Sequence, residues 1–162
     1  NAQLNWIAPG VFGALAKDHQ VIALDLRGHG QSDYPTDPAA YSEALTVADM
    51  AAILDACAEP SAIIAGLSLG GYMTMAFHLR HPERCRALMM FDTGPGFKKD
   101  DAREAWNARA RARGDDLDAR GLAALGGSDE VRMSQHRNAS GLAGAARGML
   151  AQENSGVIWS LE

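Results

Sequence analysis

The sequence predicts an α/β protein with a mostly parallel sheet of about three strands, followed by a helical segment. Through residues 1–96, short apolar runs bounded by turn residues alternate with longer stretches of helical periodicity, which is typical of parallel strands joined by helices. After Phe97 the β-branched residues nearly vanish, and Ala, Arg, Gly and Asp dominate. We therefore expect a partial α/β core over residues 1–96 and a helical segment over residues 97–162.

The first strand is predicted over residues 20–25, an apolar run that leads into a polar loop containing glycine. The first long helix is predicted over residues 46–58. Thr46 and, three residues later, Asp49 resemble a capping box at its start, and Pro60 ends it. Four apolar residues at positions i, i+3, i+4 and i+7 form a stripe that faces the core: Met50, Ile53, Leu54 and Cys57.

The most informative stretch is the G-x-S-x-G sequence from Gly66 to Gly70. It follows a strand predicted over residues 62–65 and precedes a helix predicted over residues 71–80. Strand, G-x-S-x-G and helix in this order are typical of a nucleophile elbow. A serine hydroxyl that attacks a carbonyl must stand clear of the backbone on a sharp turn. We expect this turn to bring Gly66 and Gly70 so close to the neighbouring chain that only hydrogen fits at both positions.

Ser68 is the candidate nucleophile, held by the turn in a strained backbone conformation that a protein keeps only where the strain has a use. The N-terminus of the following helix carries about half a positive charge, which favours the negative oxygen that develops during attack. The backbone N–H of Leu69 is therefore the candidate oxyanion donor. The alternative is an ordinary strand-to-helix loop, since the chain has 17 glycines among its 162 residues.

A third strand is predicted over residues 86–91, where a short apolar run ends at the turn-forming segment 92–96. Beyond Phe97, helices are predicted at residues 100–113, at residues 115–125, from Ser128 onward and at residues 141–152.

The composition is that of a soluble enzyme. The formal net charge is −5, and no basic cluster could neutralise nucleic-acid phosphates. No run of about 18 apolar residues is present, which argues against a membrane-spanning helix. Cys57 and Cys85 lie in apolar patterns and are predicted to be buried thiols rather than a disulfide or a metal pair. We expect a cytoplasmic protein without a metal ion.

A second motif, D-x-R-G-x-G-x-S, lies within residues 21–33. Together with the elbow, it strongly resembles the α/β-hydrolase superfamily. The resemblance implies that this loop is structural, so His29 is not expected to be a catalytic base. We expect Arg27, Ser32 and Asp33 to hydrogen-bond the backbone of the loop itself.

The resemblance implies an α/β-hydrolase fold in which residues 97–162 form a helical cap over the active site. Trp106, Met133 and Met149 then either line the substrate pocket or pack the cap onto the core. The implied function is a bacterial serine hydrolase, similar to carboxylesterases and enol-lactonases, that cleaves a small-molecule ester or lactone without a cofactor. Carbon–carbon bond hydrolases, cofactor-free haloperoxidases and non-catalytic ligand-binding proteins share the elbow and remain alternatives.

The family's catalytic partners follow the serine in the order acid, then histidine. None of the five histidines lies in a glycine-histidine loop after a final strand. We therefore expect an internal fragment that lacks the oxyanion loop and the C-terminal triad partners, and that is inactive alone. Asp92 is an alternative acid directly after the third strand, although a downstream acid is favoured.

The resemblance also implies that one strand is missing between residues 20–25 and the elbow strand. Strands lie about 4.8 Å apart, so they cannot pair across such a gap. The chain alone is therefore expected either to be unfolded or to pair with another chain, as in a homo-oligomer.

Overall fold

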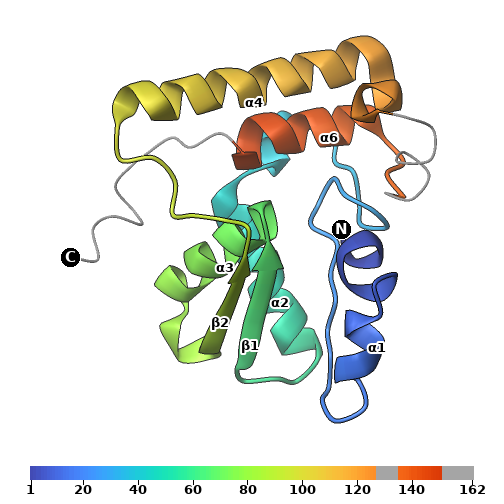
Figure 1. Cartoon of the computed structure of the whole chain (residues 1–162), viewed down its shortest axis with the longest axis vertical. Helices are drawn as coiled ribbons and strands as arrows, with labels where there is room; N and C mark the ends of the chain where they lie inside the picture. The colour runs from blue at the N-terminus through green and yellow to red at the C-terminus, as the bar shows by residue number, and fades with distance from the viewer. Residues whose placement is uncertain (127–134, 151–162) are drawn as a thin grey trace.

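The computed structural model describes residues 1–126 and 135–150 (Figure 1). In this part of the chain the sheet consists of two parallel strands, β1 (Ala62–Leu67) and β2 (Cys85–Phe91). The α-helices are α1 (Val11–Leu15), α2 (Glu43–Ala56), α3 (Leu69–Arg80), α4 (Asp100–Arg120) and α6 (Ala139–Ala145). Short 3₁₀ or π turns lie at Gln3–Ile7, Pro38–Ala40, Pro82–Arg84, Gly121–Leu125 and Ala146–Leu150.

β1 and β2 confirm two of the predicted strands, and α3 confirms the helix predicted between them. The paired residues run from Ala62 opposite Cys85 to Leu67 opposite Phe91. α3 connects the strands and contacts both of them, which is the crossover that a parallel pair requires. Both strands therefore end at the same edge of the sheet, where the chain enters α3 and the connection to α4 (Figure 1).

The prediction of a strand over residues 20–25 is wrong for the described structure. These residues form no strand and pair with neither β1 nor β2, although Leu24 packs against the core. A strand needs hydrogen bonds to a neighbour about 4.8 Å away, and no described segment lies between residues 20–25 and β1 as a strand. The described sheet therefore has two strands instead of three, and Ile63 and Met89 on it are 53% and 48% exposed.

α2 begins three residues earlier than predicted, because Ser42 rather than Thr46 caps it. The Ser42 hydroxyl accepts a hydrogen bond from the Leu45 N–H at 3.2 Å. Thr46 is fully buried, and its hydroxyl donates to the Ser42 carbonyl at 2.9 Å. In the predicted apolar stripe, Met50 and Leu54 are buried, whereas Ile53 and Cys57 are half-buried.

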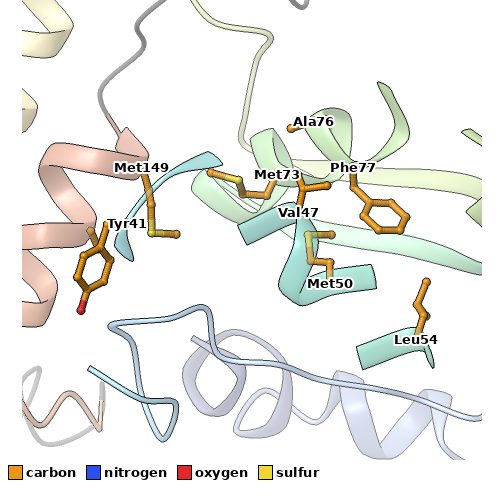
Figure 2. Close-up of a cluster of buried hydrophobic side chains, with 9 residues drawn as sticks. Tyr41, Val47, Met50, Leu54, Met73, Ala76, Phe77 and Met149 are labelled. Atoms are coloured by element: carbon orange, nitrogen blue, oxygen red, sulfur yellow. The ribbon is translucent and has the colours of Figure 1, made fainter. Parts of the chain in front are cut away.

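The core lies between α2, α3 and the C-terminal helical segment (Figure 2). Phe77 and Met73 of α3 and Val47 of α2 are almost completely buried. Met149 reaches the same cluster beside Tyr41, from the far end of the chain. The residues after Phe97 therefore share one core with the sheet and its helices.

α4 is one continuous helix, so the two separate helices predicted over residues 100–113 and 115–125 are a wrong division. Gly114, which lies between the two predicted helices, is helical and buried, and an added Cβ there would lie 2.8 Å from the Arg147 side chain. The helix ends at Gly121, whose φ of 63° is in the left-handed region. Close packing between helices, rather than chain flexibility, accounts for Gly114.

α4 and α6 lie side by side above the sheet (Figure 1). α6 begins two residues before the predicted start at residue 141, because the Asn138 side chain accepts from the Gly141 N–H at 3.1 Å and caps it. The helix predicted from Ser128 lies outside the described residues, as does Met133.

Candidate active site

Ser68 lies between the last residue of β1 and the first residue of α3. Its φ of 52° and ψ of −117° are unusual for a residue with a side chain, and such a conformation costs about 1–3 kcal/mol. Two backbone hydrogen bonds hold it. The Ser68 N–H donates to the Phe91 carbonyl at 2.9 Å, and its carbonyl accepts from the Tyr72 N–H at 3.0 Å. The turn is as sharp as the G-x-S-x-G motif predicts.

Close backbone contact explains one glycine of the motif but not the other. An added Cβ at Gly66 would lie 2.2 Å from the carbonyl carbon and oxygen of Gly70. At Gly70 itself, an added Cβ would meet no described atom within 4 Å, so the expectation that only hydrogen fits at both positions is wrong for Gly70. Gly71 is the second tightly packed position, since a Cβ there would lie 2.5 Å from Thr93 Cγ2.

A cavity of about 330 Å³ opens beside Ser68. Its polar lining side chains are Ser68, Asp92 and Thr93. Its apolar lining comes from α3, from the connection between β2 and α4, from α4 and from the turn Ala146–Leu150, and consists of Leu69, Tyr72, Phe97, Trp106, Met149 and Leu150. Trp106 and Met149 lie at the cavity, and Met149 also packs in the core. Their role in a substrate pocket stays a prediction.

Sequence reasoning missed Tyr72 and Phe97. Tyr72 could have been found, because it follows Ser68 by four residues on a helix and so shares its face. Phe97 had no comparable signal, since its position depends on the path of the chain between β2 and α4.

Asp92 follows β2 directly and lines the same cavity as Ser68. The hydrogen bond between the Ser68 N–H and the Phe91 carbonyl holds the two strand ends together. The φ of Asp92 is 47°, so it too adopts a left-handed conformation. Leu69 is the first residue of α3, and the N–H of a first helical residue has no acceptor within its own helix.

All five histidines lie within the described residues, and none of them lines the cavity. His29 and His136 pack together with ring centroids 5.4 Å apart. Burial lowers the pKa of His29, and burial together with His29 lowers the pKa of His136 to about 4. The Ser68 hydroxyl has no hydrogen-bond partner among the described residues, so residues 1–126 and 135–150 hold a candidate nucleophile without a base.

The hydrogen bonds of the loop that carries the second motif differ in part from those predicted. Arg27 does not bond its own loop. Its Nε and Nη2 each donate to the Asp49 carboxylate at 2.7 Å, and its Nη1 donates to the Ala40 carbonyl at 2.6 Å. Ser32 behaves as predicted, because its hydroxyl donates to the Asp25 carbonyl at 2.5 Å. Arg27 therefore anchors the loop to α2.

Among the described residues, no three or more His, Cys, Asp or Glu side chains are grouped so that they could hold a metal ion. Cys57 and Cys85 are free, half-buried thiols. The described helices include none with the length and apolar character needed to cross a membrane.

A strained serine between a parallel strand and the helix that follows it defines a nucleophile-elbow protein. A family model described as the alpha/beta hydrolase fold matches residues 3–139. The chain therefore belongs to the α/β-hydrolase fold family.

Two curated relatives and one solved structure give the range of similarity. A 2-hydroxymuconate semialdehyde hydrolase of Pseudomonas sp. is 39% identical over 89 residues, which cover 55% of this chain and 30% of that protein. The 3-oxoadipate enol-lactonase 2 of Acinetobacter baylyi is 34% identical over 91 residues, covering 56% and 32%. An esterase structure from Exiguobacterium antarcticum has a TM-score of 0.74 at 18% identity, over 94% of this chain and 63% of that one. The matches span about a third of each curated relative.

Proposed function

We propose that the full-length protein is a serine hydrolase that cleaves an ester, a lactone or a related acyl bond. Ser68 Oγ adds to the acyl carbon and gives its proton to the base, which passes it to the leaving oxygen as the bond between that oxygen and the acyl carbon breaks. Water then attacks the acyl carbon, which releases the acid and restores the serine hydroxyl. The N–H of Leu69 donates to the oxyanion. The observation that supports this most strongly is the strained Ser68 conformation, held by backbone hydrogen bonds at the mouth of a cavity.

The base in this proposal is a histidine beyond residues 1–162. Each of the five histidines within the chain lies away from the cavity, and the matches cover about a third of each curated relative. The acid is placed beyond the chain as well, with Asp92 as the alternative because it lines the cavity. We propose esters and lactones as the substrates, with carbon–carbon bond hydrolysis and haloperoxidase chemistry, which also occur in the superfamily, as the alternatives.

The test uses a fluorophosphonate probe, which labels activated serines. We expect it to label Ser68 in the full-length protein, and we expect Ser68→Ala to abolish labelling and to reduce ester turnover by about 10⁶-fold. Ser61→Ala, one residue before the start of β1, is the matched control and should retain both labelling and turnover. Labelling that persists in Ser68→Ala would contradict the proposal.

A non-catalytic ligand-binding protein is the second candidate. The observation that favours it is the absence of any described partner for the Ser68 hydroxyl. A full-length protein that binds small esters without probe labelling or turnover would support this candidate over the hydrolase.

Asp92→Asn tests the alternative acid. With the acid downstream, the full-length variant should retain most of its activity. A loss approaching 10⁴-fold, about that of neutralising a triad acid, would place the acid at Asp92 instead.

A further inference from the structure

The cavity beside Ser68 has one wall formed by Trp106, whose indole is fixed from three directions. Its Nε1–H donates to the Leu150 carbonyl at 2.7 Å. Its ring lies 5.6 Å from that of Phe97, and the Arg109 guanidinium lies 5.6 Å from the Trp106 ring centroid. Because the N–H is already bonded, the indole offers the cavity an aromatic surface rather than a donor. A rigid surface of this kind binds flat apolar groups with little further loss of rotamer freedom.

Tyr72 contributes a second aromatic ring from α3, and its hydroxyl is also engaged elsewhere. The hydroxyl donates to Glu43 Oε2 at 2.7 Å, and Glu43 in turn pairs with Arg80 at 2.6 Å. Burial and the adjacent Glu43 raise the pKa of Tyr72, so the phenol stays neutral. Neither aromatic side chain therefore offers a free polar group to a substrate.

Asp92 is the one charged side chain among the described residues that line the cavity. No lysine or arginine is among the described residues that line the cavity, and Arg109 stacks on Trp106 while Arg80 pairs with Glu43. An acyl group that carries a carboxylate would lose its hydration here, meet a like charge and find no cation in this lining. Desolvation and repulsion both oppose the binding of such a group.

Building on the proposed serine hydrolase function, we propose that the cavity selects substrates whose acyl group is flat, apolar and uncharged, and rejects acyl groups that carry a carboxylate. Trp106 supplies the surface that accepts the acyl group. The negative charge of Asp92 repels substrates whose acyl group carries a carboxylate. The cavity thus discriminates by charge repulsion as well as by shape.

The test compares three p-nitrophenyl esters on the full-length protein: the acetate, the phenylacetate and the hydrogen succinate. They share a leaving group, so differences in kcat/KM report on the acyl group. We expect the phenylacetate to exceed the hydrogen succinate by about 10²-fold. Equal efficiency on these two esters would overturn the proposal.

Variants assign the two roles. Trp106→Ala should lower the preference for phenylacetate over acetate by about 10-fold, and Trp106→Phe should retain most of it. Asp92→Asn should raise the efficiency on hydrogen succinate, relative to phenylacetate, by about 10-fold. Asp101→Asn, an exposed residue in the first turn of α4, makes the same charge change away from the cavity and should leave the ratio unchanged. Ratios are compared because Asp92 is also the alternative acid, whose loss would slow both esters together.

The two proposals fail in different ways. An active protein in which Asp92→Asn shifts the ratio no more than Asp101→Asn would overturn the selection by charge. A protein with no turnover and no Ser68 labelling would contradict the hydrolase function. Calorimetric binding of phenylacetate esters against hydrogen succinate esters would then test the selectivity directly, with tighter phenylacetate binding supporting it and equal affinity overturning it.

Discussion

Gly66→Ala should distort the elbow and destabilise the protein more than Gly70→Ala, the same change at the other glycine of the motif. The new Cβ would lie 2.2 Å from the backbone of Gly70, where ordinary van der Waals contact begins at 3.4 Å. The crowded atoms are backbone at the start of α3, so relief requires the helix to move by about 1 Å relative to β1. Overpacking of this kind costs about 1–3 kcal/mol. A displacement of about 1 Å at a reacting group lowers the rate by about 10²-fold.

Two measurements on the full-length protein check this prediction: urea unfolding and the rate of fluorophosphonate labelling of Ser68. Gly70→Ala is the matched control, because an added methyl there meets no described atom within 4 Å. We expect Gly70→Ala to label at close to the unmodified rate while Gly66→Ala is slower and less stable. Equal behaviour of the two variants would refute the view that contact between Gly66 and α3 sets the shape of the elbow.

Three further predictions concern the supports of the site. Arg27→Ala should lower the free energy of unfolding by about 1–2 kcal/mol in urea titrations. This loss is smaller than for a fully buried ion pair, because the Asp49 side chain is 38% exposed. A loss below roughly 0.5 kcal/mol, as for a surface pair, would contradict the anchoring role of Arg27. Ser42→Ala should remove the cap of α2 and cost about 1 kcal/mol in the same assay, and an unchanged midpoint would contradict it. Burial lowers the pKa of both His29 and His136, so protonation favours the unfolded state, and stability should fall as the pH drops from about 6.5 toward about 4. Urea unfolding at pH 7 and pH 5 measures this, and His136→Gln should reduce the difference.

The parts of the fold that were predicted correctly are those formed by residues close together in the sequence. The apolar run at residues 62–65, the glycine turn and the helix after it are specified within one stretch, and β2 pairs with β1 through the single crossover of α3. Residues 20–25 have the same apolar character. They form no strand because pairing depends on a neighbour that the described residues do not supply.

Helix boundaries depend on contacts that the sequence does not display. Serine and threonine are both favoured as N-caps, so residue type alone does not exclude Thr46. In the structure Ser42 caps α2, and Thr46 lies inside the helix with its side chain fully buried. Gly114 lies between the two helices predicted from the sequence, yet in the structure it is inside the continuous α4 and close to the Arg147 side chain.

The same distinction applies to the site. Ser68 and Leu69 could be chosen from the motif, because the elbow is built within one strand-turn-helix unit. The ring of Tyr72 and the position of Asp92 follow from that unit once its geometry is known. Phe97 and the fixed orientation of Trp106 depend on how the segment after β2 returns to the cavity, which no local pattern specifies.

This division has a consequence for how the chemistry is assembled. The contacts that hold Ser68 in its strained conformation come from Gly66, Tyr72 and Phe91, all between the start of β1 and the end of β2. One of these contacts is local, from Tyr72, and one crosses the sheet from the end of β2 to Ser68. The proposed function places the base and a second oxyanion donor in segments outside this stretch. In the proposed hydrolase, the geometry of the nucleophile and the groups that complete the catalytic site are therefore contributed by different parts of the protein.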